Sequence, residues 1–89
     1  PIVVSRPSRS GKKSWSVNVG AYNTRTGAER MLLKTALKET ATLDGSSRRV
    51  VKNSKGFNAN FVGLTQETAQ LACKRLNARG VDCRPIGPS

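Results

Sequence analysis

Asparagines occupy polar positions in two short segments in which apolar and polar residues alternate. Asn18 lies in W-S-V-N-V-G-A-Y (15–22), and Asn58 and Asn60 lie in F-N-A-N-F (57–61). A period of two is typical of a β-strand with one buried and one exposed face, so both segments predict strands with an asparagine-bearing polar face. Amide side chains donate and accept hydrogen bonds. If the two strands are neighbours in a sheet, their asparagines form one platform of hydrogen-bonding groups.

Basic residues dominate the charge of the chain. Sixteen Lys and Arg stand against five Asp and Glu, which gives a net charge of +11 in 89 residues. Net charges of about 2 to 8 are usual for a small soluble domain, so this excess favours a polyanionic partner. Charge alone leaves nucleic acid, anionic lipid and acidic polysaccharide open as that partner.

The residue types exclude several kinds of site. The chain has no His, and its five acidic residues are scattered along the sequence. A His-based triad and a His-bearing metal site are therefore excluded, and we expect neither an enzyme nor a metal or other cofactor. No apolar run approaches the length of a membrane span or of a signal-peptide core, so we expect no membrane insertion. Because the chain begins with Pro1, we expect it to be a piece of a longer, exported protein.

The elements follow from periodicity and from turn and cap residues. The pattern predicts helices at about 26–40 and between a cap at Thr65 and an end at Gly80, a connection at 41–47, and strands at 15–22, 48–52, 57–62 and 81–86. Residues 1–14 have a basic, Ser- and Pro-rich linker composition, which leaves one domain at 15–89.

The order βαββαβ predicts an α+β fold, a ferredoxin-like (RNP-like) sandwich. In this arrangement a four-stranded antiparallel sheet carries both helices on one face and leaves the other face open. Its first and third strands are central, which would place Asn18 beside Asn58 and Asn60 in the middle of the open face. We expect the domain to be a monomer.

Two cysteines occur, at positions 73 and 83. Cys73 lies on the apolar stripe of the second helix and Cys83 in the last strand, so both are expected to point into the layer between these elements. Their spacing fits neither a C-x-x-C redox motif nor a zinc site. A disulfide or two buried thiols remain, and export would favour the disulfide.

Three segments together resemble the SPOR domain family, over about residues 15–86. W-S-V-N-V-G-A-Y is similar to the family's first strand, with Asn18 where Gln is usual. F-N-A-N-F-V-G-L (57–64) is similar to its third strand, and A-C-K-R-L-N-A-R-G-V-D-C (72–83) to its closing helix and strand. The resemblance implies a noncatalytic, periplasmic peptidoglycan-binding module that recognises denuded glycan strands at the division septum. It also suggests a parent chain such as a D-alanyl-D-alanine carboxypeptidase, with this module at its C-terminus.

Eight residues are the candidate glycan-binding site: Asn18, Gly20, Tyr22, Arg48, Arg49, Asn58, Asn60 and Arg84. Amides suit sugar hydroxyl and acetamido groups, and arginines suit carboxylates. The family usually has arginines where this chain has Asn58 and Asn60, so binding is expected to rest more on the basic residues of the edge strands. Arg48 and Arg49 alternate, and only one of them can face the open side. Tyr22 fits equally a contact with a sugar ring or a place in the core.

An RNA-recognition motif is the main alternative, because it has the same fold and K-G-F (55–57) copies the start of its third-strand signature. Ala59 then replaces a stacking aromatic residue, which argues against base binding. A third possibility, a protein-docking module, lacks support because the pattern predicts no exposed apolar stripe.

Overall fold

The computed structural model describes residues 13–88, so nearly all of the expected linker at 1–14 lies outside the described residues. Seven elements follow one another along this part of the chain: β1 (Trp15–Tyr22), α2 (Arg25–Lys38), α3 (Thr40–Leu43), β2 (Ser47–Asn53), β3 (Gly56–Leu64), α4 (Gln66–Ala78) and β4 (Arg84–Ile86).

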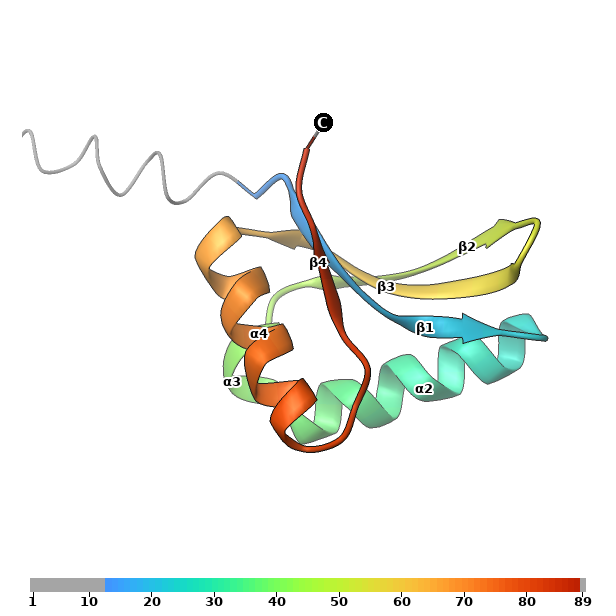
Figure 1. The fold of residues 1–89 in the computed structure, drawn as a ribbon, viewed down its shortest axis with the longest axis horizontal. Coiled ribbons are helices and arrows are strands. Elements are labelled where there is room, and N and C mark those ends of the chain that lie inside the picture. Colours follow the sequence, from blue (N-terminus) through green and yellow to red (C-terminus); the bar gives the residue numbers. More distant parts are fainter. Residues whose placement is uncertain (1–12, 89) are drawn as a thin grey trace, which may run out of the picture.

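The four strands form one antiparallel sheet in the order β2-β3-β1-β4. All three helices lie on the same side of this sheet, and its other side is open (Figure 1). This confirms the predicted α+β fold, with the first and third strands at the centre.

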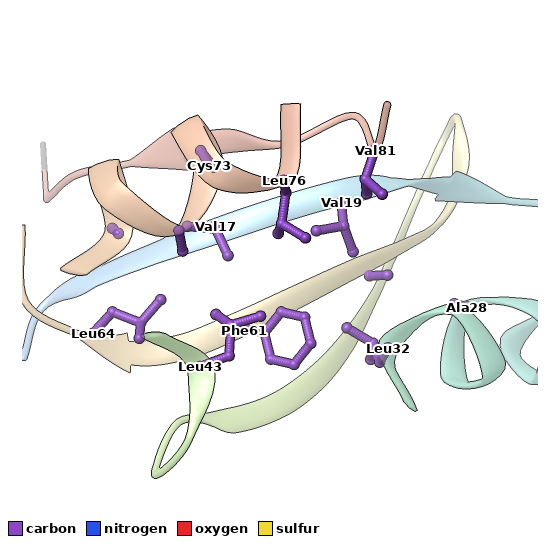
Figure 2. Close-up of a cluster of buried hydrophobic side chains, with 13 residues drawn as sticks. Val17, Val19, Ala28, Leu32, Leu43, Phe61, Leu64, Cys73, Leu76 and Val81 are labelled. Atoms are coloured by element: carbon purple, nitrogen blue, oxygen red, sulfur yellow. The ribbon is translucent and has the colours of Figure 1, made fainter. Parts of the chain in front are cut away.

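The core lies between the sheet and the helices. Val17 and Val19 of β1 and Phe61 of β3 meet Leu32 of α2 and Leu76 of α4, and each of these side chains is almost fully buried (Figure 2). Burying a side chain of this size contributes about 1.5–3 kcal/mol, so the alternation along β1 and β3 decides which face of the sheet turns inward. The asparagines between these residues are left on the open face.

The helix ends follow the cap residues. The hydroxyl of Thr24 accepts a hydrogen bond from the Gly27 amide at the start of α2, and Thr65 does the same for the Thr68 amide at the start of α4. The cap at Thr65 was predicted. Gly80 follows α4 with φ +81°, the left-handed conformation expected of a glycine after a helix.

Two predicted segments differ from the structure. The connection expected at 41–47 begins with the short helix α3, because Thr42 and Leu43 turn inward and are buried. The last strand is β4 alone, Arg84–Ile86, instead of 81–86. Val81 still packs into the core, but its amide donates to the Leu76 carbonyl oxygen at the end of α4, so Val81 belongs to the helix end and not to the strand.

Candidate functional site

The strand register aligns four polar side chains across the open face. Asn18 of β1 pairs with Asn60 of β3 on one side and with Arg84 of β4 on the other, and Asn60 pairs with Arg49 of β2. Directly opposed residues in an antiparallel sheet share a face. We call Arg84, Asn18, Asn60 and Arg49 the cross-strand row: two amides flanked by two guanidinium groups.

The register also separates the two neighbouring arginines of β2. Arg48 pairs with Phe61, which is buried among the helices, whereas Arg49 pairs with Asn60 of the open face. Arg49 therefore belongs to the cross-strand row, and Arg48 faces the helix side at the edge of the sheet. This resolves the choice that the sequence left open.

Asn18 is fixed at both ends of its amide group. Its Nδ2 donates to Oδ1 of Asn60 at 2.7 Å, and its Oδ1 accepts a hydrogen bond from the Gly20 amide at 3.0 Å. Asn58, one rung away, donates from Nδ2 to the Val51 carbonyl oxygen at 3.3 Å. Among the described residues, these bonds leave Nδ2 of Asn60 and Oδ1 of Asn58 free to meet a ligand.

A β-bulge after Asn18 changes which side chains reach the open face. Asn18 pairs with Asn60, but the next pairs are Ala21 with Asn58 and Tyr22 with Phe57, so β1 has one extra residue. Gly20 sits in this bulge with φ +118°, a conformation that favours glycine. Its contribution to the surface is therefore its backbone shape and its amide, which orients Asn18.

Tyr22 lies on the helix side of the sheet, away from the cross-strand row. It packs against the core, and its hydroxyl donates to the Val19 carbonyl oxygen at 2.8 Å. Burial, and to a lesser degree the negative charge of Asp82, raise the pKa of Tyr22, so this hydroxyl stays protonated and keeps its donor role. Of the two places that the sequence allowed for Tyr22, the structure shows the one in the core.

A hollow of about 450 Å³ opens beside the cross-strand row. It brings together four of the predicted residues with five others: Asn18, Gly20, Asn58 and Arg84, with Ala21, Lys55, Asn77, Asp82 and Cys83. Lys55 comes from the β2–β3 turn, and the last three come from α4 and the loop after it. Sequence reasoning missed Lys55, Asn77 and Asp82, because no period places a turn or loop residue on a particular face.

The loop that borders this hollow is held in place by a disulfide and by an amide. Cys73 of α4 and Cys83 form the disulfide, with their Cα atoms 4.9 Å apart, which confirms that prediction. Asn77 donates from Nδ2 to the Cys83 carbonyl oxygen and accepts from the Cys83 amide at 3.2 Å. Asp82 and Arg84 flank Cys83, so these contacts set where their charges lie.

Every aromatic side chain of the protein lies on the helix side. Trp15, Tyr22 and Phe57 pack against the core, and Phe61 is within it. The open face instead exposes aliphatic residues around the amides: Val51 is 41% exposed and Ile86 is 42% exposed. A surface that binds bases by stacking needs aromatic rings, so this face does not suit RNA.

The described residues offer little for other kinds of chemistry. Between residues 13 and 88, no three His, Cys, Asp or Glu side chains come together as a possible metal site. Within the same range, no helix has the length and apolar character needed to cross a membrane. What the open face provides is hydrogen-bond donors and acceptors between fixed positive charges, an arrangement suited to a polar anionic polymer.

Comparison with known protein families decides among the polymers. The family model of the SPOR domain matches residues 11–85. The chain belongs to the SPOR domain family. SPOR domains are binding modules for peptidoglycan and carry no catalytic machinery, so we assign this SPOR domain a peptidoglycan-binding role and no enzymatic one.

A solved structure supports the fold of this SPOR domain. The solution structure of the peptidoglycan binding domain of the B. subtilis cell wall lytic enzyme CwlC superposes with a TM-score of 0.63 at 17% sequence identity. The alignment covers 84% of this chain and 89% of that domain. No curated protein matches the chain at a significant level.

Proposed function

We propose that this SPOR domain binds denuded glycan strands across the cross-strand row and so holds its parent protein at septal peptidoglycan in the periplasm. Loss of the stem peptide leaves a lactyl carboxylate on every second sugar, with hydroxyl and acetamido groups between. The ligand is then a polyanion with many hydrogen-bonding groups. The observation that carries the proposal is the register that aligns Arg84, Asn18, Asn60 and Arg49 on one face.

The dimensions of the row suit an extended polymer. Neighbouring strands lie about 4.8 Å apart, so the row spans about 14 Å between its outer Cα atoms, enough for more than one sugar ring. Arg84 and Arg49 stand at its ends, where they can each pair with a carboxylate, and the amides between them face the uncharged part of the strand. Stem peptides on the glycan would hinder its close approach to the open face of the sheet.

The hollow beside the row extends the proposed surface. Lys55 and Arg84 supply positive charge there, and Asp82 supplies a carboxylate that can accept hydrogen bonds from sugar hydroxyls. We include Gly20 and Asn58 in the surface for their positions and leave out Tyr22 and Arg48, which face the helix side. The disulfide between α4 and the following loop fits an oxidising compartment, in keeping with export.

Cosedimentation with sacculi tests the proposal. The purified domain is mixed at physiological salt with intact sacculi and with sacculi from which an amidase has removed the stem peptides. We expect the bound fraction to rise on peptide removal, to survive nuclease treatment and to fall when free glycan chains compete. Equal binding to both preparations would contradict recognition of denuded strands, and loss of binding on nuclease treatment would point to nucleic acid.

A double variant locates the binding surface. Asn60→Ala with Arg49→Gln removes two adjacent side chains of the cross-strand row. Binding to amidase-treated sacculi should fall by about tenfold or more, because a charge-assisted hydrogen bond is worth about 1.5–3 kcal/mol. The matched control is Arg48→Gln, which removes the same charge from the opposite face. Equal losses in both variants would move the site off the open face.

A further inference from the structure

We infer that the groove between α2 and the edge strand β2 is a docking site for an extended acidic peptide, which would add to β2 as a further strand. This surface lies on the helix side of the sheet, and the inference is independent of glycan binding. Four observations carry it: joined hollows, exposed leucines, a basic rim and an open strand edge.

Two hollows run end to end along this groove. The first hollow, of about 500 Å³, lies between the N-terminal turns of α2 and the strand β2. The second hollow, of about 320 Å³, lies towards α3. Leu33 and Arg48 line both, so the two hollows adjoin beside β2, and we call them together the channel. Leu32 and Val50 form the apolar floor of the first.

Two leucines in this channel are left in contact with solvent. Leu33 is 50% exposed and Leu37 is 79% exposed, one turn apart on α2. The prediction that no apolar stripe is exposed was wrong here, because the buried stripe of α2 at Ala28 and Leu32 is narrow and leaves the next row uncovered. Leucines so placed provide an apolar contact that the folded domain itself does not use.

The rim of the first hollow is basic. Arg25, Arg48 and Arg49 line it, with Glu29 as the acid among its lining residues. The second hollow is lined by Arg48 and by one acid, Asp44. The Arg25 guanidinium lies over the ring of Phe57, 5.7 Å from its centroid, which restrains the arginine at the groove entrance. Positive charge around an apolar floor complements a strand in which carboxylates alternate with aliphatic side chains.

The backbone of β2 is available for pairing. Within residues 13–88, β3 is its one strand neighbour, and β2 is an outer strand of the sheet. An edge strand offers unpaired amide and carbonyl groups that an extended peptide can use, with adjacent pockets selecting alternate side chains. The arginines of β2 can also serve to prevent pairing between copies, as charges on edge strands do. The exposed leucines of α2 do not serve that purpose.

Charge argues against two other occupants, residues 1–12 and a second copy of the domain. The first twelve residues contain Arg6, Arg9 and Lys12 and no acid, so they carry the same sign as the rim. A second copy would bring its own Arg48 and Arg49 against those of the first. We therefore assign the groove to a peptide from an acidic partner protein.

A peptide titration followed by NMR tests this assignment. The probe is a terminally blocked peptide of about seven residues, the length of β2, in which Val and Glu alternate. Added to the full chain, it should shift the amide signals of Ser47–Asn53 and the methyl signals of Leu33 and Leu37. A peptide with Lys in place of Glu, and one with Pro at its centre, should bind much more weakly.

Matched variants identify the groove as the site. Leu33→Ser with Leu37→Ser, and separately Arg48→Gln, should each weaken binding of the Glu peptide by about tenfold. Leu71→Ser is the control, because Leu71 is a 47% exposed leucine on α4, outside both hollows. All of these positions are exposed, and circular dichroism would verify that the variants fold.

Several results would overturn the inference. They are the absence of shifts in β2 at about millimolar peptide, shifts confined to Asn18 and Asn60 on the open face, and equal binding of the Lys peptide. Dimerisation of the free domain through β2, seen by sedimentation, would assign the groove to a second copy instead.

Discussion

Arg48 and Arg49 belong to two different surfaces although they are adjacent in the chain. Successive residues of a strand face opposite sides of a sheet, so Arg49 joins the cross-strand row and Arg48 turns to the helix side, although both residues border the hollow beside α2. A charge count treats the two residues as equal. Arg48→Gln therefore changes the groove and leaves the cross-strand row unchanged.

The first prediction uses this separation. Arg49→Gln should weaken binding to denuded glycan about fivefold to tenfold, because it removes a charge-assisted hydrogen bond at an exposed site. Arg48→Gln should leave glycan binding within about twofold of the original protein. Binding isotherms with amidase-treated sacculi measure both effects. A larger loss for Arg48→Gln would place the glycan on the helix side.

The second prediction concerns the bulge at Gly20. Gly20→Ala should lower the free energy of unfolding by about 1–3 kcal/mol, because φ +118° is strained for alanine. The added methyl group would also lie 2.8 Å from the Tyr22 hydroxyl. Urea denaturation measures the loss. Gly45→Ala is a comparison at another positive φ with no atom near the added methyl group, and a larger loss there would contradict the steric part of the argument.

One buried carboxylate holds the corner between α2 and α3 against α4. Glu39 lies between the end of α2 and the start of α3, and its side chain is fully buried. It forms an ion pair with Arg75 of α4, in which Oε2 of Glu39 lies 2.7 Å from Nε of Arg75. Arg79 Nη1 lies 3.3 Å from Oε1, and Thr42 donates to Oε2 at 2.9 Å. Burial acts to raise the pKa of Glu39, but hydrogen bonds from Arg75 and Thr42 and the charges of both arginines outweigh it, so the pKa lies below its ordinary value of 4.5.

The third prediction follows from this pKa. Because the folded state lowers the pKa of Glu39, the ion pair stabilises the fold above pH 4.5, and that contribution is lost as the pH falls below it. Arg75→Gln leaves the carboxylate buried and raises its pKa, which should cost about 2–3 kcal/mol at neutral pH and less near pH 4. Thermal unfolding at both pH values measures this. Lys74→Gln, at the neighbouring exposed position, is the control, and a pH-independent loss in Arg75→Gln would contradict the mechanism.

The fourth prediction concerns the disulfide between α4 and the following loop. Replacing Cys73 and Cys83 together with Ser should lower the free energy of unfolding by about 2–3 kcal/mol, as expected for a short closed loop. It should also weaken glycan binding, because Asp82 and Arg84 lose their anchor beside the hollow. Urea denaturation and sacculus binding, with and without reductant, measure both effects. The double variant should not respond to reductant, and unchanged glycan binding would separate the loop from the site.

In the part of the chain that the structure describes, most of the positive charge lies away from the proposed glycan surface. Between residues 13 and 88, Arg49 and Arg84 lie in the cross-strand row and Lys55 in the hollow beside it, whereas Arg30, Lys34 and Lys38 follow the outer side of α2. Net charge therefore attracts polyanions in general, and we expect the cross-strand row to select among them.

The fifth prediction is a difference in salt dependence. Raising the salt from about 0.1 M to about 0.5 M should remove most binding to heparin, used as a nonspecific polyanion, because it depends on many exposed charges. Binding to denuded glycan should fall by a smaller factor, since few charges and several amides take part. Parallel isotherms at both salt concentrations measure the ratio. Equal losses for the two ligands would mean that bulk charge governs both.

Periodicity and cap residues are enough to predict the elements and the two faces of the central strands. Alternation along 15–22 and 57–61 requires one buried and one exposed face, and burial of Val17 and Phe61 then forces the asparagines outward. Cap residues such as Thr65 act locally, so they too could be predicted. The order of the elements limited the topology to one in which β1 and β3 are central.

Which side chains meet depends on contacts between elements, and these contacts could not be predicted from the sequence. The bulge at Gly20 shifts the register of β1 and turns Tyr22 towards the helices, and such a shift has no signature in a period of two. The pairing of β2 with β3 places Arg49, and not Arg48, on the open face. Lys55 and Asp82 join the hollow, and Glu39 meets Arg75, through contacts between elements distant in sequence. The alternation of apolar residues determines which face of each strand is buried. The register between strands depends on the packing of the whole core.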